Sequence, residues 1–301
     1  MEAAIRDSLR ETGAKVRYGE PLKAHTSLGI GGAAEIFAEP SDAGQLEGLL
    51  RLSAGMPVYI MGGGTNLLVA DGPLEMLVIS TSGLRGIEKI DEDGGGVVLG
   101  VWAGEPLKGL LSFCQRNGFS GLEGLAGIPG SVGGAVKGNA GAHGTEMKDI
   151  VEKVAVARRD GTLEARSAEA MGFKYRGSGL SESEMVLRAE IRLKKDGPEE
   201  IRKRMNEHFG MKKKSQPLSA RSAGCVFKNP EGFPPAGKLI DEAGLKGASR
   251  GGIEVSGIHA NFFVNRGNGT ASDFFALMDM VAAEVRKRSG AVLDPEIRIL
   301  K

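Results

Sequence analysis

The chain has few of the features that mark secreted or membrane proteins. It contains two cysteines, Cys114 and Cys225, which form no CxxC pair, and this favours free thiols in a reducing compartment. No run of about eighteen apolar residues occurs, so the sequence predicts no membrane-spanning helix. Residues 1–13 alternate charges and lack the apolar segment of a secretory signal. We therefore expect a soluble cytoplasmic protein.

Aromatic residues and net charge are also scarce. The 301 residues include one Trp and three Tyr, and the formal net charge is +1. A protein with a net charge this close to zero has no overall positive electrostatic potential to attract nucleic acid. Its basic residues are also not interleaved with aromatic residues, as they are in proteins that bind single-stranded nucleic acid. The four histidines and two cysteines show no metal-ligand spacing, so we expect no catalytic metal.

Glycine, in contrast, is abundant. The chain has 47 glycines, roughly twice the average share of about 7%. Many lie in two clusters, Gly62–Asn66 after an apolar run and the segment 121–144. Glycine at this density lets a backbone approach a flat or charged ligand closely. Two such loops predict a large ligand with a phosphate part and a planar part.

Each cluster also has a simpler interpretation. Gly62–Asn66 could be an ordinary hairpin turn instead of a row of amides, a hydroxyl and a carboxamide around a diphosphate. Residues 128–135 and 139–141 could form a flexible lid instead of a surface packed against an aromatic ring system. A third string, residues 29–34, fits G-x-G-x-x-A, but no hydrophobic strand precedes it, which disfavours a dinucleotide-binding Rossmann unit.

The order of predicted helices and strands favours an α+β fold, because it shows no repeated βαβ rhythm. Composition changes and turn signals divide the chain into three parts, 1–80, 81–196 and 197–301, with a linker at 195–198. The predicted helices cover residues 1–18, the leucine stripe 46–52, 106–115, 199–214, 236–243 and 271–288. The predicted strands cover residues 57–61, 76–80, 97–102, 151–158, 185–193, 261–265 and 295–300.

Several polar residues are candidates for chemistry, although each has an ordinary structural explanation. Arg176 lies in a small, otherwise little-charged group and could bind a carboxylate or phosphate through its forked guanidinium. Cys225 follows a glycine that could expose it, whereas Cys114 lies among leucines and is expected to be buried. The basic runs 202–204 and 212–214 could bind an anion or simply face solvent. His259 is expected to be structural.

Taken together, these strings resemble one family. The chain is similar to the UDP-N-acetylenolpyruvoylglucosamine reductases, flavoenzymes of peptidoglycan precursor synthesis. The resemblance runs from about residue 20 to the C-terminus, and its motifs follow the order of the family: HTSLGIGGAAEIFAEP, YIMGGGTNLLVAD, GLEGLAGIPGSVGGAVKGNAGAHG, FKYRGS, SAGCVFKNP, AGKLIDEAGLKG, HANFFVN and PEIRIL.

The resemblance implies a two-part FAD-binding region of the vanillyl-alcohol-oxidase type, at 1–80 and 81–196, and an α+β substrate-binding domain at 197–301. It places the FAD diphosphate at Gly62, Gly63, Gly64, Thr65 and Asn66. It places the isoalloxazine ring against Ile128, Pro129, Gly130, Ser131, Gly133, Gly134, Ala135, Asn139, Ala140 and Gly141. No histidine lies in the diphosphate loop, which favours non-covalent FAD.

The resemblance also implies the reaction. NADPH would reduce FAD, and the reduced flavin would convert UDP-N-acetylglucosamine enolpyruvate to UDP-N-acetylmuramate. Arg176 matches the arginine that pairs with the substrate carboxylate, and Glu296 matches a glutamate that assists there and is expected to have a raised pKa. Cys225 stands at the position of the proton donor, which is more often serine in the family.

Further implied contacts are less specific. Tyr175, Lys213 and Asn229 are expected to bind substrate, although which lysine of 212–214 does so stays open. His143 stands where the family commonly has tyrosine. The short segment between Arg176 and Arg188 indicates the subgroup that lacks a tyrosine-bearing substrate loop.

Two other functions are compatible with a flavin scaffold. One is an FAD oxidase that acts on an alcohol with oxygen, which fast reoxidation of the reduced protein by air alone would reveal. The other is a regulatory module that binds flavin or a nucleotide without catalysis. The motifs around Arg176, Cys225 and Glu296 disfavour both.

Overall fold

The computed structural model describes residues 3–301, and their packing divides the chain into two compact units. Unit 1 contains the chain up to Tyr18, then Ile36–Gly63 and Glu75–Met211. Unit 2 contains Gly19–Glu35, Gly64–Leu74 and Lys212–Lys301. Both units mix helices and strands, which confirms the α+β prediction. The division into three domains at residues 80 and 196 stays a prediction.

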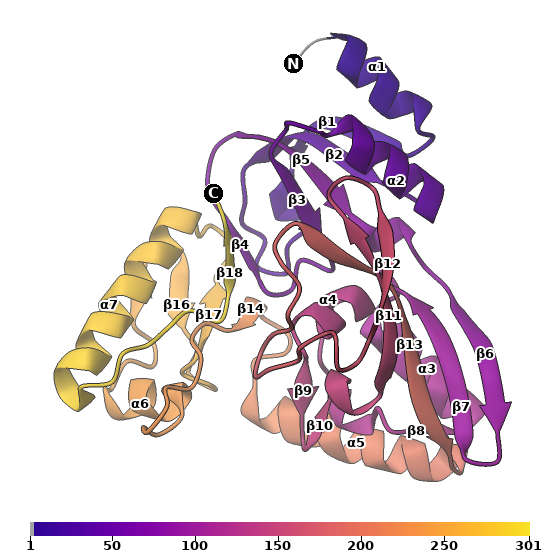
Figure 1. Cartoon of the computed structure of the whole chain (residues 1–301). Coiled ribbons are helices and arrows are strands. Elements are labelled where there is room, and N and C mark those ends of the chain that lie inside the picture. The colour runs from indigo at the N-terminus through magenta and orange to yellow at the C-terminus, as the bar shows by residue number, and fades with distance from the viewer. Residues whose placement is uncertain (1–2) are drawn as a thin grey trace. The chain divides into compact units, whose positions relative to one another are not determined.

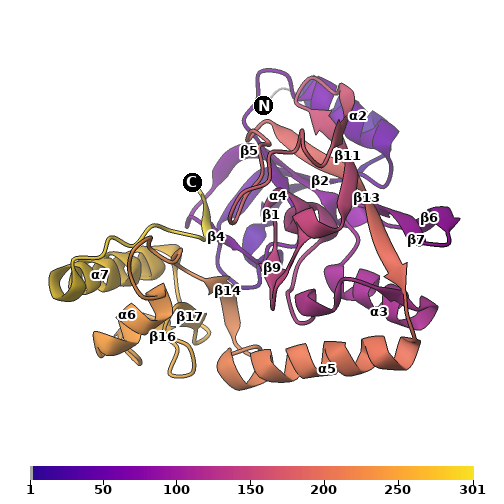
Figure 2. The ribbon, with the colours of Figure 1, turned by 60° about the horizontal axis from the view of Figure 1, so that its bottom comes forward.

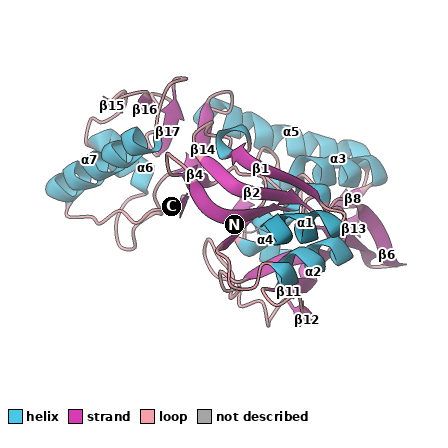
Figure 3. Ribbon diagram, turned by 90° about the horizontal axis from the view of Figure 1, so that it is seen from above, coloured by secondary structure: helices cyan, strands magenta, loops and turns pink. Residues whose placement is uncertain are grey.

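The first sheet lies mostly in unit 1 and has the order β1-β2-β5-β3. Its strands are β1 Lys15–Pro21, β2 Ala33–Glu39, β3 Val58–Met61 and β5 Leu74–Ser80, and β3 pairs with β5 in parallel. Helices α1 Ala3–Glu11 and α2 Ala43–Leu52 lie side by side (Figure 3). Leu46, Leu49 and Leu50 of α2 are buried, whereas Leu52 is 40% exposed and so lies outside the predicted stripe.

The predicted helix over residues 1–18 is wrong beyond Glu11. Gly13 has a φ of 79°, a left-handed conformation that glycine adopts without strain and that commonly ends a helix. The chain then forms β1, whose alternating apolar and polar residues begin Lys15-Val16-Arg17-Tyr18.

The second sheet of unit 1 is antiparallel, with the order β12-β11-β13-β7-β6 and with β8 paired to β13 (Figure 1). Its strands are β6 Ile87–Asp93, β7 Gly96–Trp102, β8 Phe119–Ser120, β11 Val151–Arg158, β12 Leu163–Ser167 and β13 Glu184–Lys195. Helix α3, Leu107–Asn117, buries Leu107, Leu110, Leu111 and Cys114 in the same core. Burial raises the pKa of the Cys114 thiol to about 12, as expected for an inert, packed cysteine.

The predicted linker at 195–198 is a packed corner instead. The Asp196 N–H donates to the Gly118 carbonyl at 2.9 Å, and its carboxylate accepts from Arg204 at 2.5 Å. Pro198 opens helix α5, Pro198–Ser215, which runs beside α3 (Figure 2). Helix α5 belongs to unit 1 as far as Met211.

The glycine-rich segment contributes several apolar side chains to the core that it shares with the second sheet and α3. Leu122, Leu125, Val132 and Val136 are all buried there. Residues Val132–Lys137 form a short helix, α4, and two short strands, β9 Gly141–Ala142 and β10 Thr145–Glu146, form a hairpin. None of these three elements was predicted.

Unit 2 has its own antiparallel sheet, with the order β14-β17-β16-β15, and helices α6 and α7 (Figure 1). The elements are β14 Arg221–Cys225, α6 Ala236–Glu242, β15 Ser249–Arg250, β16 Ile253–Val255, β17 Phe262–Asn265 and α7 Ala271–Ser289. Strands β4 Leu67–Val69 and β18 Arg298–Leu300 pair in parallel. Asp71 fixes the start of α7, because its carboxylate accepts from the N–H groups of Ala271 and Ser272 at 2.9 and 3.0 Å.

Within residues 3–301, no helix combines the length and the apolar character needed to cross a bilayer.

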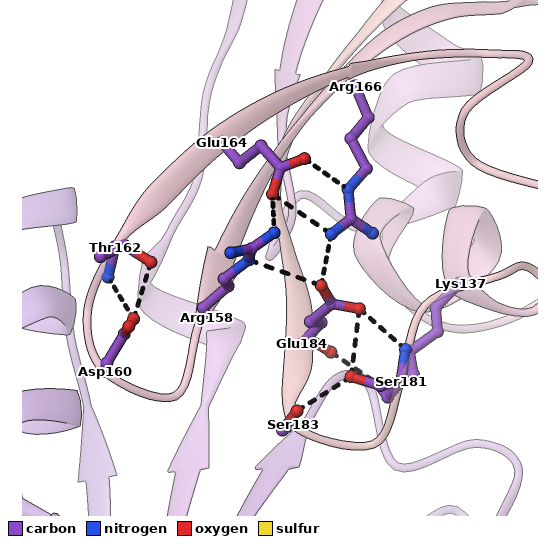
Figure 4. Close-up of polar contacts among 9 residues, drawn as sticks. All are labelled: Lys137, Arg158, Asp160, Thr162, Glu164, Arg166, Ser181, Ser183 and Glu184. Atoms are coloured by element: carbon purple, nitrogen blue, oxygen red, sulfur yellow. Dashed lines mark hydrogen bonds and ion pairs between the residues drawn. The ribbon is translucent and has the colours of Figure 1, made fainter.

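An ion-pair network closes the edge of the second sheet (Figure 4). Arg166 bonds both Glu164 and Glu184, and Arg158 approaches the same two carboxylates. The side chain of Glu184 is 12% exposed. The hydrogen bond from Arg166 lowers the pKa of Glu184 from 4.5 to about 2. Lys137, the last residue of α4, donates to the carbonyls of Ser181 and Glu184 at 3.1 Å each, so the network also fixes the end of α4.

The lowered pKa gives a pH-dependent contribution to stability. Ionised Glu184 stabilises the folded state fully above about pH 4.5, and this contribution is lost as the pH falls toward 2. We expect Glu184→Gln to lower the free energy of unfolding by about 1–2 kcal/mol at neutral pH. The difference from the native protein should shrink below pH 4.5. Urea unfolding between about pH 2 and pH 7 measures this difference in the free energy of unfolding. The control is Glu75→Gln, which changes an exposed residue of β5. Equal stability of the native and Glu184→Gln proteins at neutral pH would contradict the assignment.

Candidate functional site

Gly62 and Gly63 of the first glycine cluster meet the second cluster within unit 1. A Cβ placed on Gly63 would lie 2.8 Å from the Cα of Gly130, and one on Gly62 would lie 2.9 Å from the Oγ of Ser131. Gly130 itself has a φ of 111°, which side-chain-bearing residues rarely adopt. The loop after β3 and the loop before α4 can therefore approach at backbone distance only because both carry glycine.

The two loops that meet here are the ones expected to bind FAD, and we call the surface formed by Gly62, Gly63, Gly130 and Ser131 the cradle. Its walls at Gly62, Gly63 and Gly130 have no side chains, so backbone amides can reach a ligand directly. The second loop is held down by α4, because the Gly133 N–H donates to the Ala103 carbonyl at 2.8 Å. A Cβ on Gly133 would lie 2.7 Å from that of Ala103, so this helix also packs by backbone approach. Side-chain-free, uncharged surface of this kind fits a planar ring and a diphosphate.

Asn139, predicted to line the flavin, directs its side chain into the protein. Its Nδ2 donates to the Glu146 carboxylate at 2.9 Å and to the Lys174 carbonyl at 3.2 Å. Its Oδ1 accepts from the Lys148 N–H at 3.0 Å, and the residue is 1% exposed. Both amide donors of Asn139 are therefore used within the protein, and a contact with a cofactor would come from its backbone.

The hairpin of β9 and β10 turns at His143 and Gly144. Their φ values are 50° and 78°, the two left-handed residues of a tight hairpin turn. Histidine is among the few non-glycine residues enriched in this conformation. The ring of His143 stacks on that of His208 of α5, with centroids 4.7 Å apart. No sequence pattern indicates this contact, because the two residues are far apart along the chain.

Arg176 lies in a tight turn in which the backbones of Lys174 and Gly177 bond to each other. Its φ is 55°, and its Nη1 donates to the Gly141 carbonyl at 3.2 Å. The guanidinium carbon lies 5.3 Å from the centre of the Tyr175 ring, and Tyr175 is 56% exposed. The structure thus brings together, within unit 1, the predicted flavin segment 139–141 and the predicted substrate residues Tyr175 and Arg176.

Cys225 and Glu296 come together in unit 2. Cys225 ends β14 and is partly exposed, directly after Gly224, whose φ is 79°. The Glu296 N–H donates to the carbonyl of Val226 at 2.8 Å, so the two candidates lie on neighbouring stretches of backbone. Asn66 from the first glycine cluster joins them, because its Nδ2 donates to the Glu296 carbonyl at 3.2 Å.

A residue outside the predicted site supports this arrangement. Asn261, in the HANFFVN string, is 2% exposed, and its carboxamide bonds both the N–H and the carbonyl of Phe227, at 2.9 and 2.7 Å. Asn261 therefore holds the backbone just after Cys225. An asparagine directly before the apolar run Phe262-Phe263-Val264 was the available signal in the sequence.

The remaining candidates are less closely tied to these groups. The Oδ1 of Asn229 accepts from the Ala236 N–H at 3.0 Å and so supports the start of α6. Of the three lysines at the end of α5, Lys212 is buried, whereas Lys213 and Lys214 are exposed. His259 is partly buried and makes an edge contact with Phe262, which agrees with a structural role.

Family models match both halves of the chain. The model described as FAD binding domain matches residues 34–166, which include both glycine clusters. The model described as UDP-N-acetylenolpyruvoylglucosamine reductase, C-terminal domain, matches residues 216–300, which include Cys225 and Glu296.

The close approach of the glycine loops can be tested by adding one methyl group. Gly63→Ala places a Cβ 2.8 Å from Gly130, so the loops must separate. We expect the affinity for FAD to fall by at least about tenfold, because the cradle no longer has its shape. Titration of FAD into apoprotein measures this, with Gly94→Ala as the control, since a Cβ there meets nothing within 4 Å. Equal FAD affinity of Gly63→Ala and the native protein would show that the cradle is not the flavin site.

Whole-chain comparisons identify the family. UDP-N-acetylenolpyruvoylglucosamine reductase of Geotalea uraniireducens is 40% identical over 288 residues, covering 95% of this chain and 94% of that protein. The enzyme of Heliobacterium modesticaldum is 42% identical over 93% of this chain and 89% of its own length. The crystal structure of the Thermus caldophilus enzyme superposes with a TM-score of 0.80 at 37% identity, covering 96% of this chain and 99% of that one.

A more distant likeness concerns the fold alone. A berberine-bridge-enzyme-like protein of Physcomitrella patens has a TM-score of 0.51 at 15% identity, covering 97% of this chain and 62% of that one. The FAD-binding region therefore has the fold of the vanillyl-alcohol-oxidase and berberine-bridge-enzyme type. With its FAD-binding domain and its near-complete match to these relatives, the chain belongs to the UDP-N-acetylenolpyruvoylglucosamine reductase family of FAD-dependent oxidoreductases.

Proposed function

We propose that the protein reduces UDP-N-acetylglucosamine enolpyruvate to UDP-N-acetylmuramate in peptidoglycan precursor synthesis, with NADPH as the reductant. The observation that carries the proposal is the placement of Cys225 and Glu296 on neighbouring backbone, joined by the bond from Glu296 to Val226. These two residues match the proton donor and the glutamate of the family, and the reaction needs both beside one enol ether. The protein would act in the cytoplasm, on a nucleotide-linked substrate.

The cofactor in this proposal is non-covalent FAD. Residues Gly62–Asn66 would bind its diphosphate, and residues 128–135 and 139–141 would line its ring. The side-chain-free walls at Gly62, Gly63 and Gly130 support this assignment, and no histidine lies in residues 62–66 to tether a flavin. When bound, FAD supplies the hydride that the substrate double bond receives. On this basis the domains are two FAD-binding parts, 1–80 and 81–196, and a substrate-binding domain, 197–301.

Arg176 would bind the carboxylate of the enolpyruvyl group. Addition of hydride to the terminal carbon pushes negative charge toward that carboxylate, and a fixed guanidinium stabilises this charge more in the transition state than in the substrate. The turn of residues 174–177 and the bond from Arg176 to the Gly141 carbonyl limit how far the guanidinium can move. Tyr175, Lys213 and Asn229 are proposed to bind other parts of the substrate.

Cys225 would donate the proton that completes the product. An ordinary thiol has a pKa of about 8.5 and is largely protonated near neutral pH, so cysteine can replace the serine that is more common at this position. Glu296 would face the substrate carboxylate, and it can do so without repulsion only when its own carboxyl group is protonated.

Variants at Cys225 test the assignment. We expect Cys225→Ser to retain at least about a tenth of the native rate, because a hydroxyl can also donate a proton. Cys225→Ala should lose product formation by about a hundredfold or more, while one equivalent of NADPH is still oxidised in a single turnover. Mass spectrometry measures UDP-N-acetylmuramate, and absorbance follows NADPH. Native turnover by Cys225→Ala would refute the donor role, and no product from the native protein would refute the proposed function.

A further inference from the structure

The described chain contains three non-glycine residues with a positive φ, and all three gather in one part of unit 1. They are Asn139, His143 and Arg176, with φ values of 42°, 50° and 55°. Such conformations cost roughly 1–3 kcal/mol each and persist only where neighbouring contacts maintain them. Asn139 and His143 belong to the segment that forms the β9–β10 hairpin, and Arg176 bonds the first residue of β9. Contacts with neighbouring residues must therefore maintain Arg176 in this conformation.

We infer that Asn139 is a positioning residue for Arg176, holding the turn of residues 174–177 against the β9–β10 hairpin. The inference rests on the proposed function, because it assumes that Arg176 binds the substrate carboxylate. Asn139 does not touch substrate; it acts through Arg176.

Asn139 joins the hairpin to the turn directly. One N–H of its carboxamide donates to the Lys174 carbonyl, two residues before Arg176, at 3.2 Å. The other N–H donates to the Glu146 carboxylate in β10 at 2.9 Å, and Oδ1 accepts from the Lys148 N–H. Because the residue is 1% exposed, these bonds are not exchanged for bonds to bulk water.

Arg176 makes a second connection between the turn and the hairpin. Its Nη1 donates to the Gly141 carbonyl, and Gly141 lies opposite Glu146 in the hairpin register. The turn is thus held at two points, the Lys174 carbonyl by Asn139 and the Arg176 guanidinium by Gly141. One hydrogen bond would leave the long arginine side chain free to take several directions. The two bonds together restrict the direction of the guanidinium.

The carboxylate of Glu146 holds the side chain of Asn139 in place by accepting its hydrogen bond. This carboxylate also accepts from Lys148 Nζ at 2.8 Å, and the Glu146 N–H donates to Asp149 at 2.7 Å. The hydrogen bond from Lys148 lowers the pKa of Glu146, and the bond from Asn139 and the charge of Arg176 lower it further. Glu146 is therefore an ionised, fixed acceptor for Asn139 and a nearby counter-charge for Arg176.

The test separates the side chain of Asn139 from its backbone conformation. Asn139→Gly removes the three hydrogen bonds but keeps a residue that adopts a positive φ without strain. Asn139→Asp keeps the shape and also tolerates this conformation, but its ionised carboxylate cannot donate to Lys174 or Glu146. Each variant is compared as the FAD-loaded protein, with urea unfolding and flavin content measured alongside.

Calorimetric titration with UDP-N-acetylglucosamine enolpyruvate, without NADPH, gives a dissociation constant that does not depend on turnover. We expect Asn139→Gly and Asn139→Asp each to raise this constant by about tenfold, because the carboxylate meets a guanidinium that is no longer fixed. In an Arg176→Lys background the same changes should raise it less than about threefold, because the group that Asn139 positions is gone.

Two outcomes would overturn the inference. The first is native affinity in both Asn139 variants. The second is an equal fold-change in the native and Arg176→Lys backgrounds, which is the result expected of a general loss of stability. If the native protein itself did not bind the enolpyruvyl nucleotide, the proposed function would fail instead, so the two failures are distinguishable. If one Asn139 variant did not fold, the other would still give the comparison.

Discussion

The backbone contact between Gly63 and Gly130 is the constraint on which the rest of unit 1 depends. It can form only because neither position carries a side chain, and it fixes the loop after β3 against the loop that leads into α4. Two further contacts follow from the position of α4. Lys137 at its end is tied to the edge of the sheet, and the residues that follow lead through Asn139 into the hairpin that Arg176 bonds. The glycine loops proposed to bind FAD and the arginine proposed to bind the substrate carboxylate are thereby connected through α4 and the hairpin.

In unit 2 the proposed proton donor, Cys225, and the proposed carboxyl group, Glu296, lie on neighbouring stretches of backbone. Backbone hydrogen bonds hold these stretches together. The stretch after Cys225 pairs with residues 294–297, and the buried Asn261 satisfies both polar groups of Phe227. Cys225 is the last residue of β14, and the backbone of Glu296, which lies just before β18, is fixed by its bond to Val226. If Cys225 is the proton donor, the backbone fixes its location, and either a thiol or a hydroxyl could serve there.

Local patterns predicted much of the fold. The leucines of α2 and α3, the apolar runs of β7 and β13 and the burial of Cys114 all followed from spacing. Helix α4 was missed because its sequence, Val-Gly-Gly-Ala-Val-Lys, contains two poor helix formers and is stabilised by packing against Ala103. The same packing explains why a glycine-rich segment could enter the core: its few large residues, such as Val132 and Val136, fill space left by close backbone approach.

The site was predictable only in its parts. Glycine clusters indicated a cradle, and the family resemblance supplied Arg176, Cys225 and Glu296, but the sequence did not indicate what holds them. Asn139 reaches Lys174, 35 positions away, and Glu296 bonds Val226 across 70 positions. Bonds between residues so far apart leave no periodic pattern in a single sequence. The family resemblance places Asn139 at the flavin, and only the structure shows that its side chain is used in contacts within the protein, which leaves its backbone for the cofactor.

Hydrogen–deuterium exchange of the apoprotein, with and without added FAD, tests the central claim most directly. We predict slower exchange of the backbone amides of residues 62–64 and 130–131 when FAD is present, because the proposed site places the cofactor over these loops. Amides of α7, which takes no part in the cradle, should exchange at the same rate in both samples. Unchanged exchange at both glycine loops, with protection elsewhere in the chain, would contradict the assignment of the cradle to FAD.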